Sequence, residues 1–250
     1  MAKSIAVAGK GGTGKTTIAA LLILELVRQG KRPVLAVDAD PDANLGALLG
    51  VVPKQSIGDL REEVRATMKN FPAGMSKASY VEAGLNQLIQ EADGFDLVTM
   101  GRGEGAGCYC YLNTLIKKFS DDLTPSYLWV VIDNEAGLEH ISRRTSTNID
   151  TLLVIATDNP LSLSSAGRIQ ELTDTLEKRI NQRFLVTNMV KAERLPVIQQ
   201  RLASLRLEHL CDIPYDPILE ETVFAGLPLQ DLSDGPAMQA IKTILKRVDD

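Results

Sequence analysis

Short runs of β-branched and apolar residues alternate along the chain with longer segments whose apolar residues recur at helical spacing. Several of the short runs are apolar throughout, as expected of strands that are covered on both faces of a parallel sheet. The pattern predicts an α/β fold: a mostly parallel β-sheet with helices on both faces. The predicted strands are Ser4–Ala8, Pro33–Asp38, Phe95–Met100, Leu128–Asp133, Thr151–Thr157 and Arg183–Asn188.

The longer segments predict helices, the first of which Gly30 would end. These helices are Lys15–Gln29, Gln55–Lys69, Tyr80–Glu91, Leu163–Ile180, Glu193–Leu205 and Ala237–Arg247. Glycines and prolines are scattered, and no repeat or linker divides the 250 residues. We therefore expect a single domain over residues 1–250.

The predicted strand Ser4–Ala8 runs directly into GKGGTGKT at residues 9–16, a match to the phosphate-binding loop G-x-x-x-x-G-K-[ST]. A strand before this sequence and a helix after it are the context that such a loop requires. Lys15 would reach the β- and γ-phosphates, and the Thr16 hydroxyl would bind Mg²⁺. The predicted nucleotide-binding residues here are Gly9, Lys10, Gly11, Gly12, Thr13, Gly14, Lys15, Thr16 and Thr17.

Carboxylates follow two of the predicted strands at the edge where open α/β sheets bind ligands. Asp38 and Asp40 follow one strand, and Asp133 ends the apolar run YLWVVID. Asp133 has the Walker B arrangement, which holds Mg²⁺ through water, and Asp38 would support the same ion. The alternative for Asp38 is a capping residue of the following turn. Gly137, four residues beyond Asp133, would place its N–H against the γ-phosphate.

The second lysine of the loop, Lys10, resembles the signature lysine of the deviant Walker A ATPases, the family of the nitrogenase iron protein and the cell-division (MinD-like) and partition ATPases. The resemblance implies that Lys10 reaches the nucleotide of a partner subunit in a homodimer. It also implies that Asp40 positions or polarises the attacking water. Lys10, Lys15 and Asp40 are accordingly the candidate catalytic residues. The alternative for Lys10 is a solvated lysine that adds positive potential.

The same resemblance implies a base pocket. Asn188, at the end of a predicted strand, matches the asparagine that reads the adenine edge in this family, although a capping asparagine is the alternative. The segment CDIPYDP at residues 211–217 resembles the family's I-P-x-D segment, which places Pro214 along the base. The sequence has T-N-M-V where a guanine-specific N-K-x-D would stand, which favours ATP.

Charge and composition narrow the classes of partner. With 27 basic and 32 acidic residues the net charge is −5, and aromatic residues make up 4% of the chain, so nucleic acid is not an expected ligand. No targeting or membrane segment is evident, and we expect a cytoplasmic protein without a membrane partner. Three cysteines are too few, and odd in number, for a disulfide framework.

Two of the cysteines, Cys108 and Cys110, stand one residue apart after a glycine-rich stretch. In extended backbone both thiolates would face the same side and could hold one ion. The alternatives are burial as small apolar side chains and a redox pair, which a C-x-C ring would strain. Two sulfurs are half of a tetrahedral site, but two chains related by a two-fold axis would supply four. Four thiolates suit Zn²⁺ or an Fe–S cluster, and a square-planar arrangement suits Ni²⁺.

The combination of GKGGTGKT, DADPD, CYC and DNEAGLEH, in this order, resembles the nickel-insertion ATPases that mature carbon monoxide dehydrogenase, the CooC type, with a related branch that serves acetyl-CoA synthase. The resemblance implies a homodimer that binds ATP or ADP with Mg²⁺, holds Ni²⁺ (or Zn²⁺) at Cys108 and Cys110, and inserts nickel into the client's metal cluster.

Four other functions are compatible with the loop. A division ATPase needs a membrane-binding C-terminal helix and a partition ATPase a basic face, neither of which the sequence favours. An Fe–S carrier of the nitrogenase-iron-protein type usually has its cysteines far apart or in C-P-x-C. A non-catalytic scaffold would not need Asp40 and Asp133.

Overall fold

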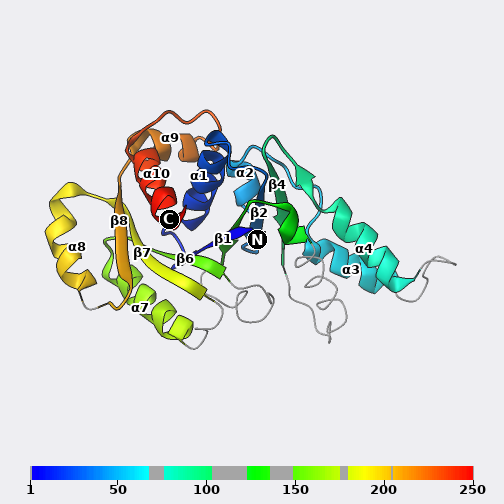
Figure 1. Cartoon of the computed structure of the whole chain (residues 1–250), viewed down its shortest axis with the longest axis horizontal. Coiled ribbons are helices and arrows are strands. Elements are labelled where there is room, and N and C mark those ends of the chain that lie inside the picture. The colour runs from blue at the N-terminus through cyan, green and yellow to red at the C-terminus, as the bar shows by residue number, and fades with distance from the viewer. Residues whose placement is uncertain are drawn as a thin grey trace.

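A computed structural model describes residues 2–67, 76–102, 123–135, 149–174, 180–203 and 205–249. Their strands form an eight-stranded sheet of order β3-β4-β2-β5-β1-β6-β7-β8, in which β3 alone is antiparallel to its neighbour (Figure 1). The strands are β1 (Lys3–Gly9), β2 (Val34–Ala39), β3 (Gln90–Glu91), β4 (Phe95–Thr99), β5 (Trp129–Asn134), β6 (Ile149–Ala156), β7 (Ile180–Val190) and β8 (Glu208–Pro214). The predicted fold class is confirmed, as are all six predicted strands.

Helices cover both faces of the sheet. Side chains alternate along each strand, so Val34 and Ala36 pack against α1 and α10, whereas Leu35 packs on the opposite face against α3 and α4. Helices α7 and α8 cover that opposite face beyond β1. The helices are α1 (Lys15–Arg28), α2 (Leu45–Leu48), α3 (Ile57–Thr67), α4 (Lys77–Gln87), α7 (Pro160–Asp174), α8 (Leu195–Leu202), α9 (Pro217–Phe224) and α10 (Pro236–Asp249), with 3-10 turns η1 (Thr124–Ser126) and η3 (Ala192–Arg194).

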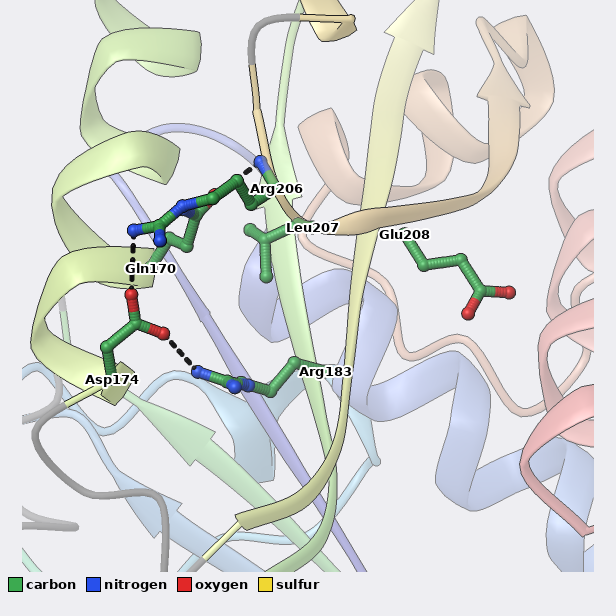
Figure 2. A pocket seen from close by; sticks show the side chains of 6 residues that line it. All are labelled: Gln170, Asp174, Arg183, Arg206, Leu207 and Glu208. Carbon is green, nitrogen blue, oxygen red and sulfur yellow. Dashed lines mark hydrogen bonds and ion pairs between the residues drawn. The ribbon is translucent and has the colours of Figure 1, made fainter.

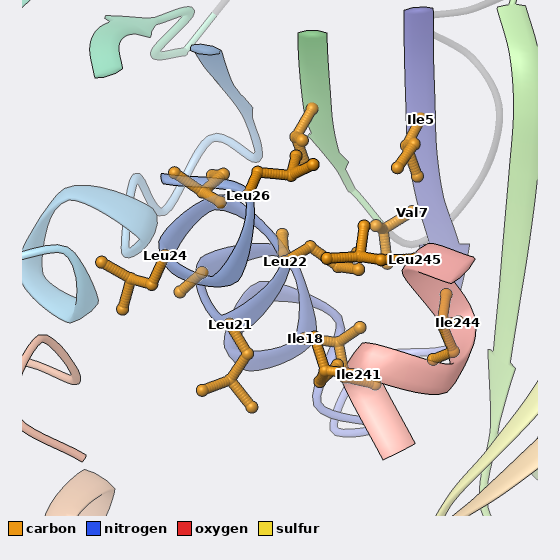
Figure 3. Packing of buried hydrophobic residues seen from close by; sticks show 14 of the residues in the cluster. Ile5, Val7, Ile18, Leu21, Leu22, Leu24, Leu26, Ile241, Ile244 and Leu245 are labelled. Atoms are coloured by element: carbon orange, nitrogen blue, oxygen red, sulfur yellow. The ribbon is translucent and has the colours of Figure 1, made fainter. Parts of the chain in front are cut away.

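The centre of the larger core is α1, which packs on the sheet beside α10 (Figure 3). Ile18 and Leu22 are fully buried among Val7 of β1 and Ile241 and Leu245 of α10. Each buried aliphatic side chain stabilises the fold by about 1.5–3 kcal/mol. Because α1 follows the phosphate-binding loop directly, this packing fixes where the loop ends.

The predicted helices are confirmed, but their ends differ. The prediction Tyr80–Glu91 is wrong at its C-terminal end, since α4 ends at Gln87 and Gln90–Glu91 forms β3, which pairs with β4. The prediction Leu163–Ile180 is wrong at Ile180, which begins β7, where it is buried and paired with Ile149; α7 is described as far as Asp174. Glu193 lies in the turn η3, because Pro196 favours a helix start near Leu195. Of the described helices, none is long and apolar enough to cross a membrane.

The two ends of the chain are joined at the amino-terminal edge of the sheet. The Asp249 carboxylate accepts hydrogen bonds from Lys3 and Lys31, each at 2.7 Å. Both ammonium groups lie over the Trp129 ring, 5.5 and 5.9 Å from its centroid. The hydrogen bonds from Lys3 and Lys31 lower the pKa of Asp249.

We expect Asp249→Asn to lower the free energy of unfolding by at most about 1 kcal/mol, since these ion pairs are partly exposed. A lowered carboxyl pKa stabilises the fold above the unfolded pKa, and the contribution is lost as the pH falls through the folded pKa. Urea unfolding at pH 7 should therefore show the difference, and unfolding at a pH low enough to protonate Asp249 in the folded chain should not. An equal difference at both pH values would contradict this account.

Candidate nucleotide and cation site

The residues predicted to bind nucleotide meet at the carboxyl ends of β1, β2, β5 and β7. These strands are neighbours in the sheet, with β5 between β2 and β1, and β6 between β1 and β7. This edge is where ligands bind in open α/β sheets, because strands end there and helices begin.

The loop between β1 and α1 has the backbone of a phosphate-binding loop. Gly12 and Gly14 have φ values of +78° and +84°, and Gly14 is the N-cap residue of α1. The Thr13 hydroxyl donates to the Lys10 carbonyl at 2.8 Å and so closes the loop on itself. Lys15, the first residue of α1, is buried at 6% exposure. Helix dipole, loop N–H groups and one buried ammonium make this an anion site.

Two positions of this loop accept only glycine. A Cβ on Gly9 would lie 2.3 Å from the Ile155 carbonyl oxygen of β6, a backbone atom that cannot move aside. A Cβ on Gly14 would lie 2.4 Å from the Asn188 side-chain nitrogen. The loop is therefore packed directly against β6 and β7.

Asp38 and Asp133 are register partners on the adjacent strands β2 and β5, and both are fully buried. Burial raises the pKa of Asp38 to about 6. Burial also raises the pKa of Asp133 to about 7, an effect that the nearby Thr16 hydroxyl and Lys15 oppose and that the charges of Asp38 and Asp40 strengthen. A cation placed beside two such buried carboxyls would favour their charged forms and lower both pKa values.

The two carboxylates differ in their hydrogen-bond partners. Asp38 accepts N–H hydrogen bonds from Leu45 at 3.0 Å and Asp40 at 3.3 Å, so the capping geometry left open for Asp38 is present at the start of α2. Both oxygens of Asp133 are buried without a hydrogen-bond partner. Mg²⁺ takes oxygen ligands and keeps several of its waters. The oxygen donors of Thr16, Asp38 and Asp133 fit a hydrated magnesium ion.

Asp40 lies beyond the end of β2 and is partly exposed, as is Lys10 in the loop. The Asp40 carboxylate accepts the Asp42 N–H at 3.0 Å, which holds the turn that carries it. Exposure suits both residues to the predicted roles toward water or a second subunit. Those roles stay predictions.

Asn188 reaches the phosphate-binding loop from β7. Its side-chain N–H donates to the Thr13 carbonyl at 2.9 Å, and the residue is 7% exposed. Pro214, the last residue of β8, is exposed and pairs with Val190, so the two predicted base-pocket residues lie on neighbouring strands. In this structure the amide of Asn188 is engaged by the loop, and reading of an adenine edge stays a prediction.

Two buried polar residues at the same edge, Thr99 and Asn134, were given no role from the sequence. Thr99 ends β4 with its hydroxyl buried and unpartnered. Asn134 follows Asp133 and donates to the Val7 carbonyl at 3.0 Å, while its carbonyl oxygen has no partner. A polar residue at the end of an apolar strand was the available signal.

The three cysteines and Gly137 lie away from this site or outside the described residues. Cys108, Cys110 and Gly137 lie outside the described residues. Within the described ranges, no group of three or more His, Cys, Asp or Glu side chains is placed to hold a metal ion. The third cysteine, Cys211, is partly buried, and burial, with the Asp212 charge, raises its thiol pKa to about 12, which makes it unreactive.

An open pocket of about 620 Å³ lies at the opposite edge of the sheet, at the amino ends of β7 and β8 (Figure 2). Asp174, at the end of α7, accepts hydrogen bonds from Arg183 at 2.7 Å and Arg206 at 2.9 Å, and Glu208 pairs with Arg247. The charged groups there are paired with one another and join α7 to the last two strands. The pocket is lined by Gln170, Asp174, Arg183, Arg206, Leu207 and Glu208.

Comparisons with known proteins also indicate a nucleotide-binding domain. Residues 4–229 match the CobQ/CobB/MinD/ParA nucleotide binding domain. The chain is 40% identical over 232 residues to an uncharacterized ATP-binding protein of Methanocaldococcus jannaschii, covering 92% of this chain and 91% of that protein. It is 32% identical to the carbon monoxide dehydrogenase accessory protein CooC of Rhodospirillum rubrum, covering 92% and 90%. The MinD cell division protein of Aquifex aeolicus superposes with a TM-score of 0.71 at 21% identity, covering 99% and 97%.

Proposed function

Because the chain belongs to the CobQ/CobB/MinD/ParA nucleotide-binding family and is a P-loop ATPase, we propose that it uses ATP hydrolysis to deliver nickel to a client enzyme. The proposed client is carbon monoxide dehydrogenase or acetyl-CoA synthase, and nickel is the cargo. The observation that carries the proposal is the pair Cys108 and Cys110, which a P-loop ATPase does not need for hydrolysis. The 32% identity to the CooC accessory protein supports it.

In the proposed hydrolysis site, Lys15 binds the β- and γ-phosphates from its buried position at the start of α1. Thr16, Asp38 and Asp133 hold the hydrated magnesium ion, which when bound neutralises charge on the phosphates. Asp40, partly exposed beyond β2, orients the attacking water. Asn188 and Pro214 place the base beside the loop, and Gly137 contacts the γ-phosphate.

In the proposed assembly, two chains face each other across their nucleotide sites, and Lys10 of each reaches the nucleotide of the other. The same two-fold axis would bring Cys108 and Cys110 of both chains together as four thiolates. One dimer would then carry one metal ion. Because nucleotide and metal would share the interface, each would change the affinity of the other by the same factor.

Nickel binding tests the proposal directly. We expect equilibrium dialysis of anaerobically purified protein to give one Ni²⁺ per two chains, with a dimer in light scattering. Cys108→Ser/Cys110→Ser should lose at least 100-fold in nickel affinity, because a thiolate is a far better ligand than a hydroxyl. Cys211→Ser is the matched control and should bind nickel like the wild type, since this thiol is partly buried and protonated.

The same preparation separates the alternatives. Stoichiometric nickel binding by a monomeric double-serine variant would contradict the interface site. A brown protein containing iron and sulfide would identify an Fe–S carrier.

A MinD-like division or partition ATPase is the second candidate function, favoured by the likeness of the whole fold to MinD. ATP hydrolysis without binding of nickel or any Fe–S cluster would favour this candidate over the nickel carrier.

A further inference from the structure

Thr99 lies in a row of three buried polar side chains across the sheet. Thr99 of β4 is the register partner of Asp38 of β2, which in turn is the register partner of Asp133 of β5. Neighbouring strands are about 4.8 Å apart, so Asp38 lies between the other two, about one strand spacing from each. The exposed fractions of Thr99, Asp38 and Asp133 are 3%, 0% and 0%.

All three side chains lie on the α1 face of the sheet. Two residues before each of them, Leu97, Ala36 and Val131 belong to the core cluster that surrounds α1. Side chains at i and i+2 of a strand share a face. The Thr99 hydroxyl therefore faces the same space as the carboxylates at the carboxyl end of the sheet, where α1 begins at Lys15.

The Thr99 hydroxyl is unusual among buried hydroxyls of the described residues, because it has no hydrogen-bond partner. Thr13 donates to the Lys10 carbonyl at 2.8 Å, Thr173 donates to the Gln170 carbonyl at 2.7 Å, and Ser165 donates to the Leu161 carbonyl at 2.9 Å. A buried hydroxyl without a partner costs free energy, and valine would fill the same volume without that cost. The oxygens of Asp133 in the same row are also without partners.

The backbone beside Thr99 is fixed, so the hydroxyl cannot leave this row. The Met100 N–H donates to the Asp38 carbonyl at 2.8 Å, and the Met100 carbonyl accepts the Gly58 N–H at 2.9 Å. A Cβ on Gly101 would lie 2.2 Å from the Ser56 side-chain oxygen, so the chain is also held closely on the side of α3.

We propose that Thr99 is a positioning residue of the cation site: its hydroxyl donates to the Asp38 carboxylate and accepts a hydrogen bond from a water of the bound divalent cation. The proposal rests on the roles proposed above for Asp38 and Asp133. The Asp38 oxygens each accept one backbone N–H and can accept a further donor. Filling the row with a hydrated cation would give partners to the unpaired atoms of both Thr99 and Asp133.

Thr99→Val tests this role because it keeps the shape and removes the hydroxyl. Titration with Mn²⁺ in the presence of ADP, followed by electron paramagnetic resonance, should show about a tenfold loss of Mn²⁺ affinity. The Mg²⁺ concentration for half-maximal ATP hydrolysis should rise by a similar factor. Without nucleotide or cation, the variant should unfold at the same temperature as the wild type or higher. Thr99→Ser should restore the Mn²⁺ affinity.

Thr173→Val is the matched control. Thr173 is fully buried at the opposite end of the sheet, where its hydroxyl donates to the Gln170 carbonyl and accepts from Arg183. This variant should unfold at a lower temperature and bind Mn²⁺ like the wild type.

Wild-type Mn²⁺ affinity in Thr99→Val would overturn the proposal, as would a lowered unfolding temperature with unchanged affinity. Nickel enters none of these measurements, so a wild-type protein that binds no nickel contradicts the carrier function and not the role of Thr99.

Discussion

Replacing Lys15 with alanine is expected to lower the kcat of ATP hydrolysis by at least 100-fold. Lys15 is 6% exposed, so its ammonium acts on the phosphates in a site that excludes most water, where one charged donor is worth about 10²–10³ in rate. The Lys15 charge also opposes the rise in the pKa of Asp133 that burial causes. The variant would therefore lose the ammonium group that favours the ionised Asp133 carboxylate. Steady-state phosphate release at saturating ATP and Mg²⁺ measures the effect.

Lys246→Ala is the matched control for this charge. Lys246 lies on the exposed side of α10, in a helix that packs on α1 and contributes no predicted site residue. It should hydrolyse ATP at the wild-type rate. A Lys15→Ala protein that retains more than about a tenth of the wild-type kcat would show that phosphate binding in this loop does not depend on its buried lysine.

Asp133→Asn is expected to raise the unfolding temperature of the nucleotide-free, cation-free protein at pH 8 by at least about 3 °C, while abolishing ATP hydrolysis. Asp133 has a pKa of about 7 in the folded chain, against 3.8 for an ordinary aspartate. The unfolded chain therefore releases this proton more readily, and stability falls as the pH rises from about 4 to about 7. At pH 8 the ionised Asp133 lowers the free energy of unfolding by its full amount, on the order of 2–4 kcal/mol.

Calorimetry in EDTA at pH 8 and pH 5 measures this effect. The gain from Asp133→Asn should shrink at pH 5, where the folded wild type keeps its proton. Asp150→Asn is the control, since Asp150 accepts hydrogen bonds from the Ser4 N–H at 2.8 Å and hydroxyl at 2.9 Å, and its loss should destabilise the fold at both pH values. A lower unfolding temperature for Asp133→Asn at pH 8 would mean that the carboxylate stabilises the empty fold.

The sheet could be predicted because its inner strands are covered on both faces and therefore contain continuous apolar runs, as β1 does at residues 5–8 and β6 at residues 152–156. The edge strand β8 is only partly buried and mixes polar with apolar residues, so it has no such pattern. Helix α9 has no buried residue, and its Phe224 is 85% exposed, which leaves no periodicity to detect. Its N-cap, Asp216 before Pro217, was the available sequence signal.

The loop and Asp133 could be predicted because phosphate binding requires a fixed spacing of residues along one stretch of chain. Contacts between distant stretches could not. Asn188 donates to the Thr13 carbonyl although the two residues are 175 positions apart in the sequence. Thr99 is the register partner of Asp38 only because β4 lies beside β2. These two relations depend on strand order, which local spacing does not encode.

The ionic contact between Lys3 and Asp249 places both of these residues at the edge of the sheet away from the phosphate-binding loop. In the proposed dimer, which closes through the nucleotide sites, these positions would lie at the two outer poles of the assembly. A fluorophore at residue 249 of each chain would then form a donor–acceptor pair whose separation follows the closing of the dimer. The same outer poles would let the protein be tethered to a surface while its nucleotide face stays open to solution.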